Sequence, residues 1–183
     1  MTFSKLSASL AAASLLAIGG VAIANPMVGG AAMYETKNIV ENAVNSADHT
    51  TLVAAVQAAG LVDTLASAGP FTVFAPTNAA FGKLPAGTVD TLLKPENKGT
   101  LTAVLTYHVV PGRMSAGQIA DMAKKNGGKA VLTTVQGAQI SIWGKGGKWY
   151  VTDAKGGTAQ ITIADVNQSN GVIHVVDGVL LPG

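Results

Sequence analysis

The residues that could perform acid–base or metal chemistry are few, and the three histidines come first. His108 and His174 each lie beside valines, and His49 lies at the expected start of a helix. A metal site would need further ligands, but no carboxylate stands at a ligand-like spacing from His108 or His174. We therefore interpret both as partly buried rings whose N–H groups bind backbone carbonyls. The chain contains no cysteine, which excludes thiol nucleophiles, thiolate metal sites and disulfides.

Other chemical motifs are weaker still. Asp165 and Asn167, followed by Asn170 and Gly171, repeat oxygen donors at short spacing, but the acids and closing Glu of a calcium-binding EF-hand are missing. Turn formation is the simpler interpretation of these residues. The sequence also has no nucleophile-elbow or phosphate-loop pattern. We predict no catalytic residue, no metal, no cofactor and no enzymatic activity.

Tyr107 is the residue best suited to recognition. Tyrosine is enriched both at the rim of protein cores and in interfaces, so a core role and a surface role stay open. His108, Val109 and Val110 follow it directly as an extended segment, and the two valines have the pattern of a buried strand.

The elements that must position these residues change in type along the chain. Periodicity and capping residues predict helices over 38–44, 48–59, 61–68, 88–93 and 98–106. Runs of β-branched and aromatic residues predict strands over 71–75, 131–135, 139–143, 148–152, 159–163 and 172–180. Helices first and strands second favour an α+β domain with a mostly antiparallel sheet or wedge.

The first and last strands carry the clearest local signals. Phe71 and Phe74 lie in a strand that Pro76 ends, Thr77 can cap the following turn, and Phe81 anchors that turn in the core. The stretch from Asn170 and Gly171 through His174 and Asp177 to Pro182 begins at a turn dipeptide and continues as a valine-rich run. That run is typical of a central strand covered on both faces.

Three ordered motifs together resemble the fasciclin (FAS1) domain family. They are residues 71–81, the Tyr107–His108 segment through Gly112, and residues 170–182. The resemblance covers about residues 38–183, the length of one domain. It implies a compact β-wedge with helices packed along one side.

The resemblance also implies a function. Members of this family are usually linked to cell adhesion, and the Tyr–His region has been proposed as the adhesion determinant. This would assign binding to Tyr107, His108, Val109 and Val110. We expect a non-enzymatic module that recognises a cell-surface or matrix protein or polysaccharide, and that forms a weak homo-oligomer in order to link two surfaces.

An alternative function is a periplasmic small-molecule carrier or assembly factor with an apolar pocket. The aromatic side chains available to line such a pocket are Phe71, Phe74, Phe81, Trp143, Trp149 and Tyr150. The same residues would equally form the core, because they lie in or beside strands.

The N-terminus indicates export. Lys5 precedes an apolar run that ends in a small-x-small site, which predicts a signal peptide over residues 1–24, cut after Ala24. An uncleaved anchor would need an apolar run of about 20 residues. Residues 25–37 have no sustained period and are expected as a flexible lead-in to one domain at 38–183.

The formal net charge of +2 is too small to indicate nucleic-acid binding. Lysines cluster between residues 124 and 155, but glycines interleave most of them, so we interpret them as solvated hairpin tips. We expect a secreted or periplasmic protein with no transmembrane span after cleavage.

Overall fold

The computed structural model describes residues 24–183, so the predicted signal peptide falls outside the described residues apart from Ala24. The α-helices are α1 (Ile39–Ala43), α2 (Thr50–Ala59), α3 (Val62–Ala66), α4 (Asn78–Gly82), α5 (Thr88–Leu92), α6 (Lys98–Tyr107) and α7 (Ala116–Lys125). The strands are β1 (Met27–Val28), β2 (Ala31–Ala32), β3 (Phe71–Pro76), β4 (Val109–Pro111), β5 (Lys129–Thr133), β6 (Gln139–Lys145), β7 (Lys148–Thr152), β8 (Thr158–Gln168) and β9 (Gly171–Val176). Short 3₁₀ turns, η1 (Ala47–His49) and η2 (Pro95–Asn97), precede α2 and α6.

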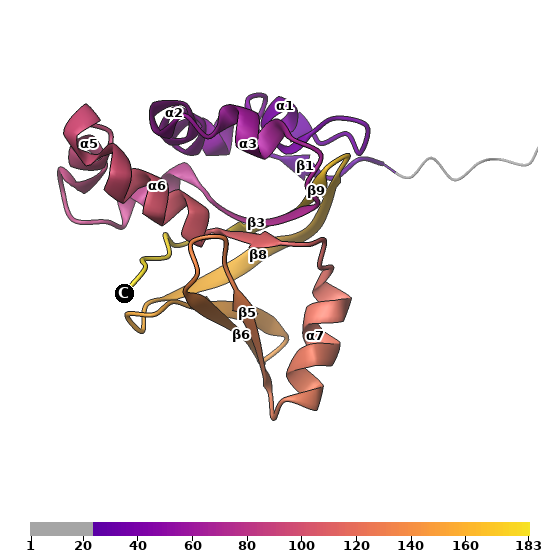
Figure 1. The fold of residues 1–183 in the computed structure, drawn as a ribbon. Coiled ribbons are helices and arrows are strands. Elements are labelled where there is room, and N and C mark those ends of the chain that lie inside the picture. The colour runs from indigo at the N-terminus through magenta and orange to yellow at the C-terminus, as the bar shows by residue number, and fades with distance from the viewer. Residues whose placement is uncertain (1–23) are drawn as a thin grey trace, which may run out of the picture.

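Seven strands form one sheet in the order β4-β3-β9-β8-β7-β6-β5. Only β3 and β9 are parallel, and every other neighbouring pair is antiparallel. The sheet curls until its two edges meet, where the Val135 amide donates to the Val109 carbonyl at 2.7 Å. Helices and a mostly antiparallel sheet confirm the predicted α+β class (Figure 1).

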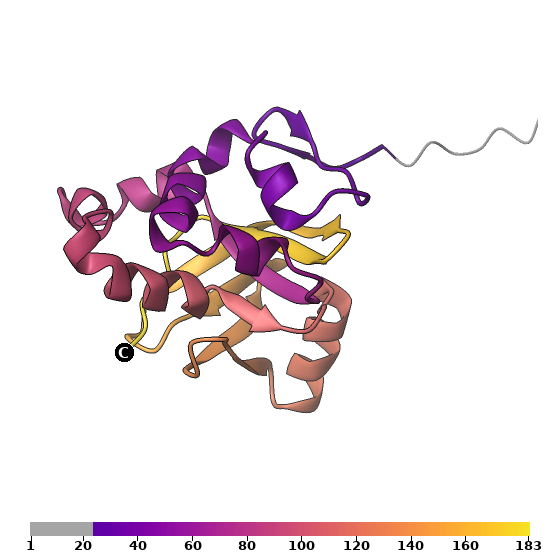
Figure 2. The same ribbon diagram turned by 45° about the horizontal axis from the view of Figure 1, so that its top comes forward.

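Strand β9 divides the interior into two cores. All six of its residues are buried, as predicted for a central strand, but the strand ends at Val176 and not at residue 180. Because side chains alternate along a strand, Ile173 and Val175 face one core while Val176 faces the other. The first core lies beneath α1, α2, α3 and α6, and the second lies against α7 and the inner faces of β5 to β7. Figures 1 and 2 show these helices on the two sides of the curled sheet.

The glycine-rich loop between β6 and β7 is a hairpin, as its sequence predicts. Lys145 and Lys148 are the last paired residues, which leaves a two-residue turn. Gly146 and Gly147 both have positive φ, at 60° and 77°, and a turn of this kind requires such values at both central positions.

Two segments differ from the sequence-based expectation. Residues 115–125 were not predicted as an element, yet Ser115 and Gln118 form a reciprocal capping box that begins α7. The expected flexible lead-in instead contains the β1–β2 hairpin, and Val28 and Met33 are only 4% and 2% exposed. Its few apolar side chains complete the first core, a tertiary effect that periodicity cannot reveal.

The Asn170–Gly171 turn ties the helices to the sheet. The Asn170 amide group donates to the carbonyls of Leu65 and Ser67, both at 2.7 Å, and its oxygen accepts from the Ile39 amide at 3.0 Å. A Cβ at Gly171 would collide with the Phe71 carbonyl oxygen, so only glycine allows β9 to begin this close to β3. Within residues 24–183, no helix is long and apolar enough to cross a membrane.

Candidate functional site

The four residues predicted to bind a partner lie where α6 passes into β4, and all four are buried. Tyr107 is 0% exposed, His108 2%, Val109 6% and Val110 3%. Val109 packs in the first core, whereas Tyr107 and Val110 pack in the second. In the folded domain these side chains therefore join the two cores and present almost no surface to a partner.

The Tyr107 hydroxyl links the end of α6 to the start of β6 and to the turn after β7. It donates to the Gln139 carbonyl at 2.8 Å and accepts from the Ala154 amide at 2.9 Å. Burial raises the pKa of the Tyr107 phenol above its usual value, and the Asp153 carboxylate acts in the same direction. The phenol is thus held neutral as a structural donor and acceptor.

His108 holds the segment that follows β9. Its Nδ1 lies 2.8 Å from the Val104 carbonyl and its Nε2 accepts from the Leu180 amide at 2.9 Å. A carbonyl can only accept and an amide can only donate, so the ring is neutral with its proton on Nδ1. Burial lowers the pKa of His108 to about 4, although the Val104 carbonyl and Asp153 oppose the shift.

Asp153 is a structural residue that was not predicted from the sequence. It is 8% exposed, and its carboxylate accepts from the amides of Lys155, Gly157 and Leu181 at 2.7–3.0 Å. Two of these bonds close the β7–β8 turn, a pattern that an Asp before a glycine-rich turn could have indicated. The third bond comes from the Leu181 amide. Together with the bond from the Leu180 amide to His108, it holds residues 180 and 181 against the domain.

The other motif residues also stabilise the fold. Phe74 is 0% exposed, Phe81 is 7% exposed, and Thr77 caps α4 by accepting from the Ala80 amide at 3.2 Å. Asp177 accepts from the Gln160 amide at 2.7 Å and pairs with Lys83 at 3.3 Å. The remaining residues predicted in these motifs, Phe71, Pro76 and Pro182, are buried or half-buried.

His174 is 0% exposed and stacks on Phe74 with 5.5 Å between ring centroids. Its Nε2 lies 2.9 Å from the Met114 carbonyl, and its Nδ1 accepts from the Asp165 amide at 3.3 Å. Burial lowers the pKa of His174. Asp165 and Asn167, expected in a turn, instead lie within β8, where Asp165 adopts a positive φ of 56° beside a bulge and accepts from the Ala116 amide.

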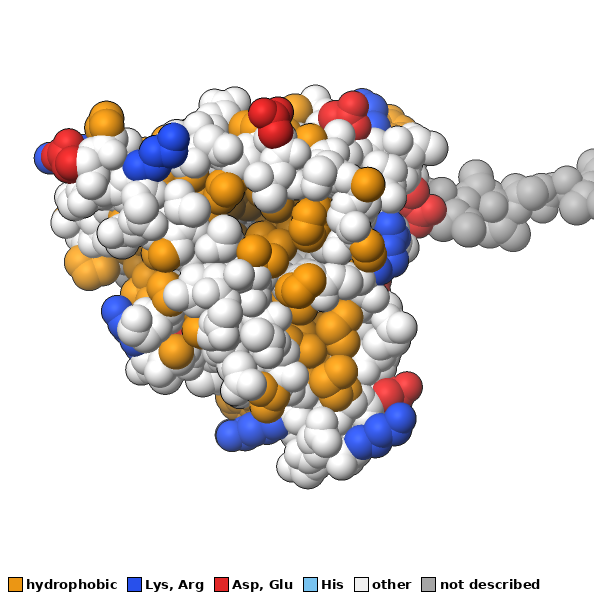
Figure 3. Space-filling view, viewed as in Figure 1, with side chains coloured by type: hydrophobic (Ala, Val, Ile, Leu, Met, Phe, Trp, Pro, Cys, Tyr) orange, Lys and Arg blue, Asp and Glu red, His pale blue; other side chains and the backbone are white. Residues whose placement is uncertain are grey.

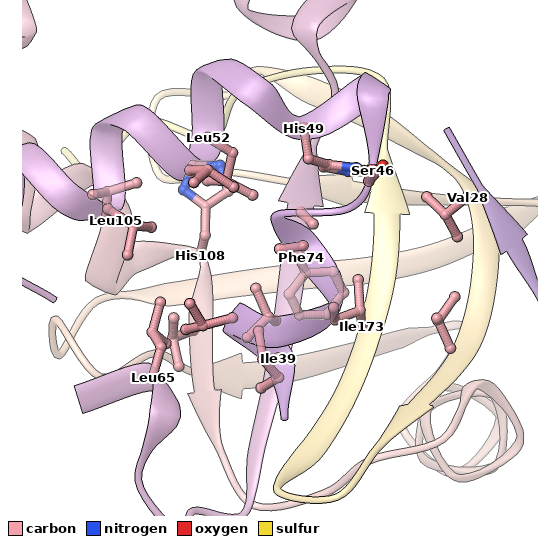
Figure 4. A pocket seen from close by; sticks show the side chains of 18 of the residues that line it. Val28, Ile39, Ser46, His49, Leu52, Leu65, Phe74, Leu105, His108 and Ile173 are labelled. Carbon is pink, nitrogen blue, oxygen red and sulfur yellow. Dashed lines mark hydrogen bonds between the residues drawn. The ribbon is translucent and has the colours of Figure 1, made fainter. Parts of the chain in front are cut away.

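His49 lines a small cavity between the helices and the sheet. The cavity has a volume of about 60 Å³, and Figure 4 shows Leu52 and Ile39 from the helices and Phe74 from the sheet around it. The His49 Nδ1 lies 2.9 Å from the Ser46 hydroxyl, but its buried Nε2 has no hydrogen-bond partner.

Burial lowers the pKa of His49, and the nearby Ala75 carbonyl opposes this without making a hydrogen bond to Nε2. His49 is therefore a neutral ring with one unused nitrogen at a mostly apolar cavity. An unpaired buried polar atom of this kind is uncommon and calls for an explanation.

The aromatic residues expected to line an apolar pocket do not gather at this cavity. Phe74 is the only one of the six in its wall, and the other lining side chains are mostly aliphatic. Trp149 lines a different hollow of about 250 Å³ between α7 and the sheet. Trp143 and Tyr150 lie on the outer face of the sheet, as their alternation with buried Ile142 and Val151 shows.

This arrangement brings no acid–base set together. His49 and His108 line the same cavity and His174 lies elsewhere, and Ser46, Met114, Val104, Leu180 and Asp165 take up five of their six ring nitrogens. Among residues 24–183, no group of three or more His, Asp or Glu side chains could hold a metal ion. The described site residues are suited to fixing the fold.

Comparison with known proteins identifies the family. The fasciclin domain family matches residues 47–182. The chain belongs to the fasciclin domain family. A fasciclin domain pair from the insect cell adhesion molecule fasciclin I superimposes with a TM-score of 0.71 at 17% identity, covering 79% of this chain and 51% of that one. The predicted family and fold are therefore confirmed.

Several bacterial fasciclin proteins resemble the chain in sequence. Protein sll1483 of Synechocystis is 47% identical over 156 residues, which cover 85% of this chain and 79% of that protein. The immunogenic protein MPB70 of Mycobacterium bovis is 36% identical over 191 residues, which cover 93% of this chain and 90% of that protein. The cell surface glycolipoprotein MPB83 of the same species is 38% identical, covering 67% of this chain and 48% of that protein.

The hydroxyl of Tyr107 is expected to stabilise the domain measurably. Tyr107→Phe keeps the ring but leaves the Gln139 carbonyl and the Ala154 amide without their partner. The loss should be about 1–3 kcal/mol in the free energy of unfolding. Chemical denaturation measures it, and Tyr34→Phe serves as control because Tyr34 is 44% exposed. Equal stability of the two variants would contradict the structural role.

Acidification should destabilise the domain through His108. Its folded pKa of about 4 lies below the unfolded value of 6.5, so the unfolded chain binds more protons between these limits. The stabilisation is complete above the unfolded pKa and is lost as pH falls towards the folded pKa, by on the order of 3 kcal/mol. His49 and His174 act in the same direction.

Denaturant unfolding measured from neutral pH down to about pH 4 tests this dependence. His108→Gln should be less stable at neutral pH but lose less stability on acidification. Wild-type stability that is constant or rises through this window would contradict the assignment.

Proposed function

We propose that the protein is an exported, non-enzymatic binding module of the adhesion type, whose partner is a cell-surface or matrix component. Membership of the fasciclin family carries this proposal. A mycobacterial relative is a cell surface glycolipoprotein, and the structural neighbour comes from a cell adhesion molecule. The signal-like N-terminus supports export, and the neutral, hydrogen-bonded histidines favour binding over catalysis.

Recognition falls to the surface of the domain, because the Tyr107–Val110 segment is buried. In Figure 3 the charged side chains lie mainly towards the rim of the visible face, while hydrophobic side chains run through its middle. Exposed apolar patches that are bordered by polar side chains are typical of interaction surfaces. A single domain can link two surfaces only if it has a second binding contact. We therefore propose that the protein also forms a weak homo-oligomer.

The purified protein should attach saturably to cells of its own host. Tyr107→Phe, assayed below its melting temperature, should attach as wild type does, because the missing hydroxyl lies inside the domain. Flow cytometry of labelled protein measures attachment, with heat-unfolded protein as the control. A folded Tyr107→Phe that no longer attaches would return the recognition role to Tyr107, and absence of wild-type attachment would contradict the proposed function.

A second function, carriage of a small apolar molecule, is favoured by the cavity. Its volume of about 60 Å³ exceeds the roughly 10–15 Å³ that one water needs, and the unpaired His49 Nε2 offers one hydrogen bond to a polar end group. A longer ligand would have to part α1 and α2 from the sheet. The wall is apolar enough for such a ligand to bind by burial.

Native mass spectrometry of protein isolated from its own host tests carriage. Ala43 lines the cavity, so Ala43→Leu should reduce the fraction of protein with bound ligand. Ala58→Leu is the matched control, because Ala58 lies exposed on α2. A wild-type protein that carries no ligand, or equal loss in both variants, would contradict this second function.

A further inference from the structure

The outer faces of β5, β6 and β7 form a patch of two aromatic rings among lysines. Trp143 and Tyr150 are direct cross-strand neighbours, and their rings stack with centroids 4.9 Å apart at 26°. The Trp143 Nε1 donates to the Thr152 hydroxyl at 2.9 Å, which fixes the indole on the sheet. Both rings are half-buried, so part of each reaches solvent.

Three exposed lysines surround this pair. Lys129 lies directly opposite Trp143, and Lys145 lies opposite Lys148 beside the hairpin turn. Residues two apart point to the same side of a strand, so Lys145 shares the face of Trp143 and Lys148 that of Tyr150. We call these five residues, Lys129, Trp143, Lys145, Lys148 and Tyr150, the aromatic–lysine face.

The charge of this face is uncompensated. Strands β5, β6 and β7 contain no Asp or Glu. The ion pairs in the described part of the chain, Lys83–Asp177 and Lys124–Asp121, do not involve its lysines. An anionic partner therefore meets positive charge with no carboxylate on the same strands to oppose it.

We propose that the aromatic–lysine face binds an anionic polysaccharide, which specifies the partner in the proposed function and rests on it. The apolar C–H face of a pyranose ring stacks on Trp143 or Tyr150, as such rings do on aromatic side chains. Carboxylate or sulfate groups of the chain pair with the lysines. The five residues lie on three neighbouring strands, so one extended sugar chain can contact them together.

Neighbouring polar residues suit a sugar better than a lipid surface. Ser141 and Thr152 are paired beside Trp143 and Tyr150, and Gln160 lies opposite Tyr150 on β8. Hydroxyl and amide groups can bind sugar hydroxyls. A membrane-binding face would instead project several large apolar side chains, whereas Trp143 and Tyr150 stack on each other and Val131 is the exposed aliphatic side chain beside them.

Affinity electrophoresis tests this inference with the whole protein in native gels that contain polygalacturonate, with neutral dextran as the reference matrix. Wild type should be retarded by polygalacturonate alone, and added salt should reduce retardation because it screens exposed charges. The Lys129→Gln, Lys145→Gln, Lys148→Gln triple variant should bind about tenfold more weakly. The control triple variant Lys37→Gln, Lys94→Gln, Lys98→Gln removes the same charge elsewhere and should bind as wild type.

The variant Tyr150→Thr tests the contribution of the aromatic rings to binding. It removes one ring, keeps every lysine of the face, and introduces a residue that is common in strands. Its retardation should fall while its melting stays cooperative. Absence of wild-type retardation, equal loss in both triple variants, or binding only to phosphatidylglycerol vesicles would each overturn the inference. Cell attachment that survives in the first triple variant would overturn it while leaving the proposed function intact.

Discussion

The parallel pairing of β3 with β9 is the interaction on which the rest of the structure depends. It runs from Phe71 opposite Gly171 to Pro76 opposite Val176. Both strands are covered on both faces, so their alternating side chains supply each of the two cores. Helices α1, α2, α3 and α6 pack against the first core, and helix α7 packs against the second. Loss of this pairing would therefore separate the cores and free both groups of helices.

The buried polar residues follow from this constraint. His174 lies in β9, and Tyr107 and His108 lie at the end of α6 between the two cores. Because water does not reach these positions, all three side chains must find partners in the protein. They find them in backbone groups far away in sequence, such as the amides of Leu180 and Ala154. The polar groups that look most chemical in the sequence are thus committed to the fold.

Much of the fold was predictable from local patterns, and the valines beside His108 and His174 predicted that both rings are buried. The capping role expected of His49 is not seen, because its side chain makes no cap hydrogen bond. The hairpin at Gly146–Gly147 and the cap at Thr77 were equally local. Long-range effects were not predictable. Val28 and Met33 are buried only because the first core has room for them, and the burial of Tyr107 depends on the Gln139 carbonyl and the Ala154 amide, which lie far away in sequence. The aromatic–lysine face likewise exists only through the cross-strand register.

The β3–β9 pairing also sets a schedule for biosynthesis. Its first partners, Phe71 and Gly171, are 171 − 71 = 100 residues apart. A ribosome adding 5–20 residues per second needs about 5–20 seconds to make that segment. Throughout that interval β3 lacks its central partner, and neither core can close. The two cores can therefore close only after almost the whole domain has been synthesised.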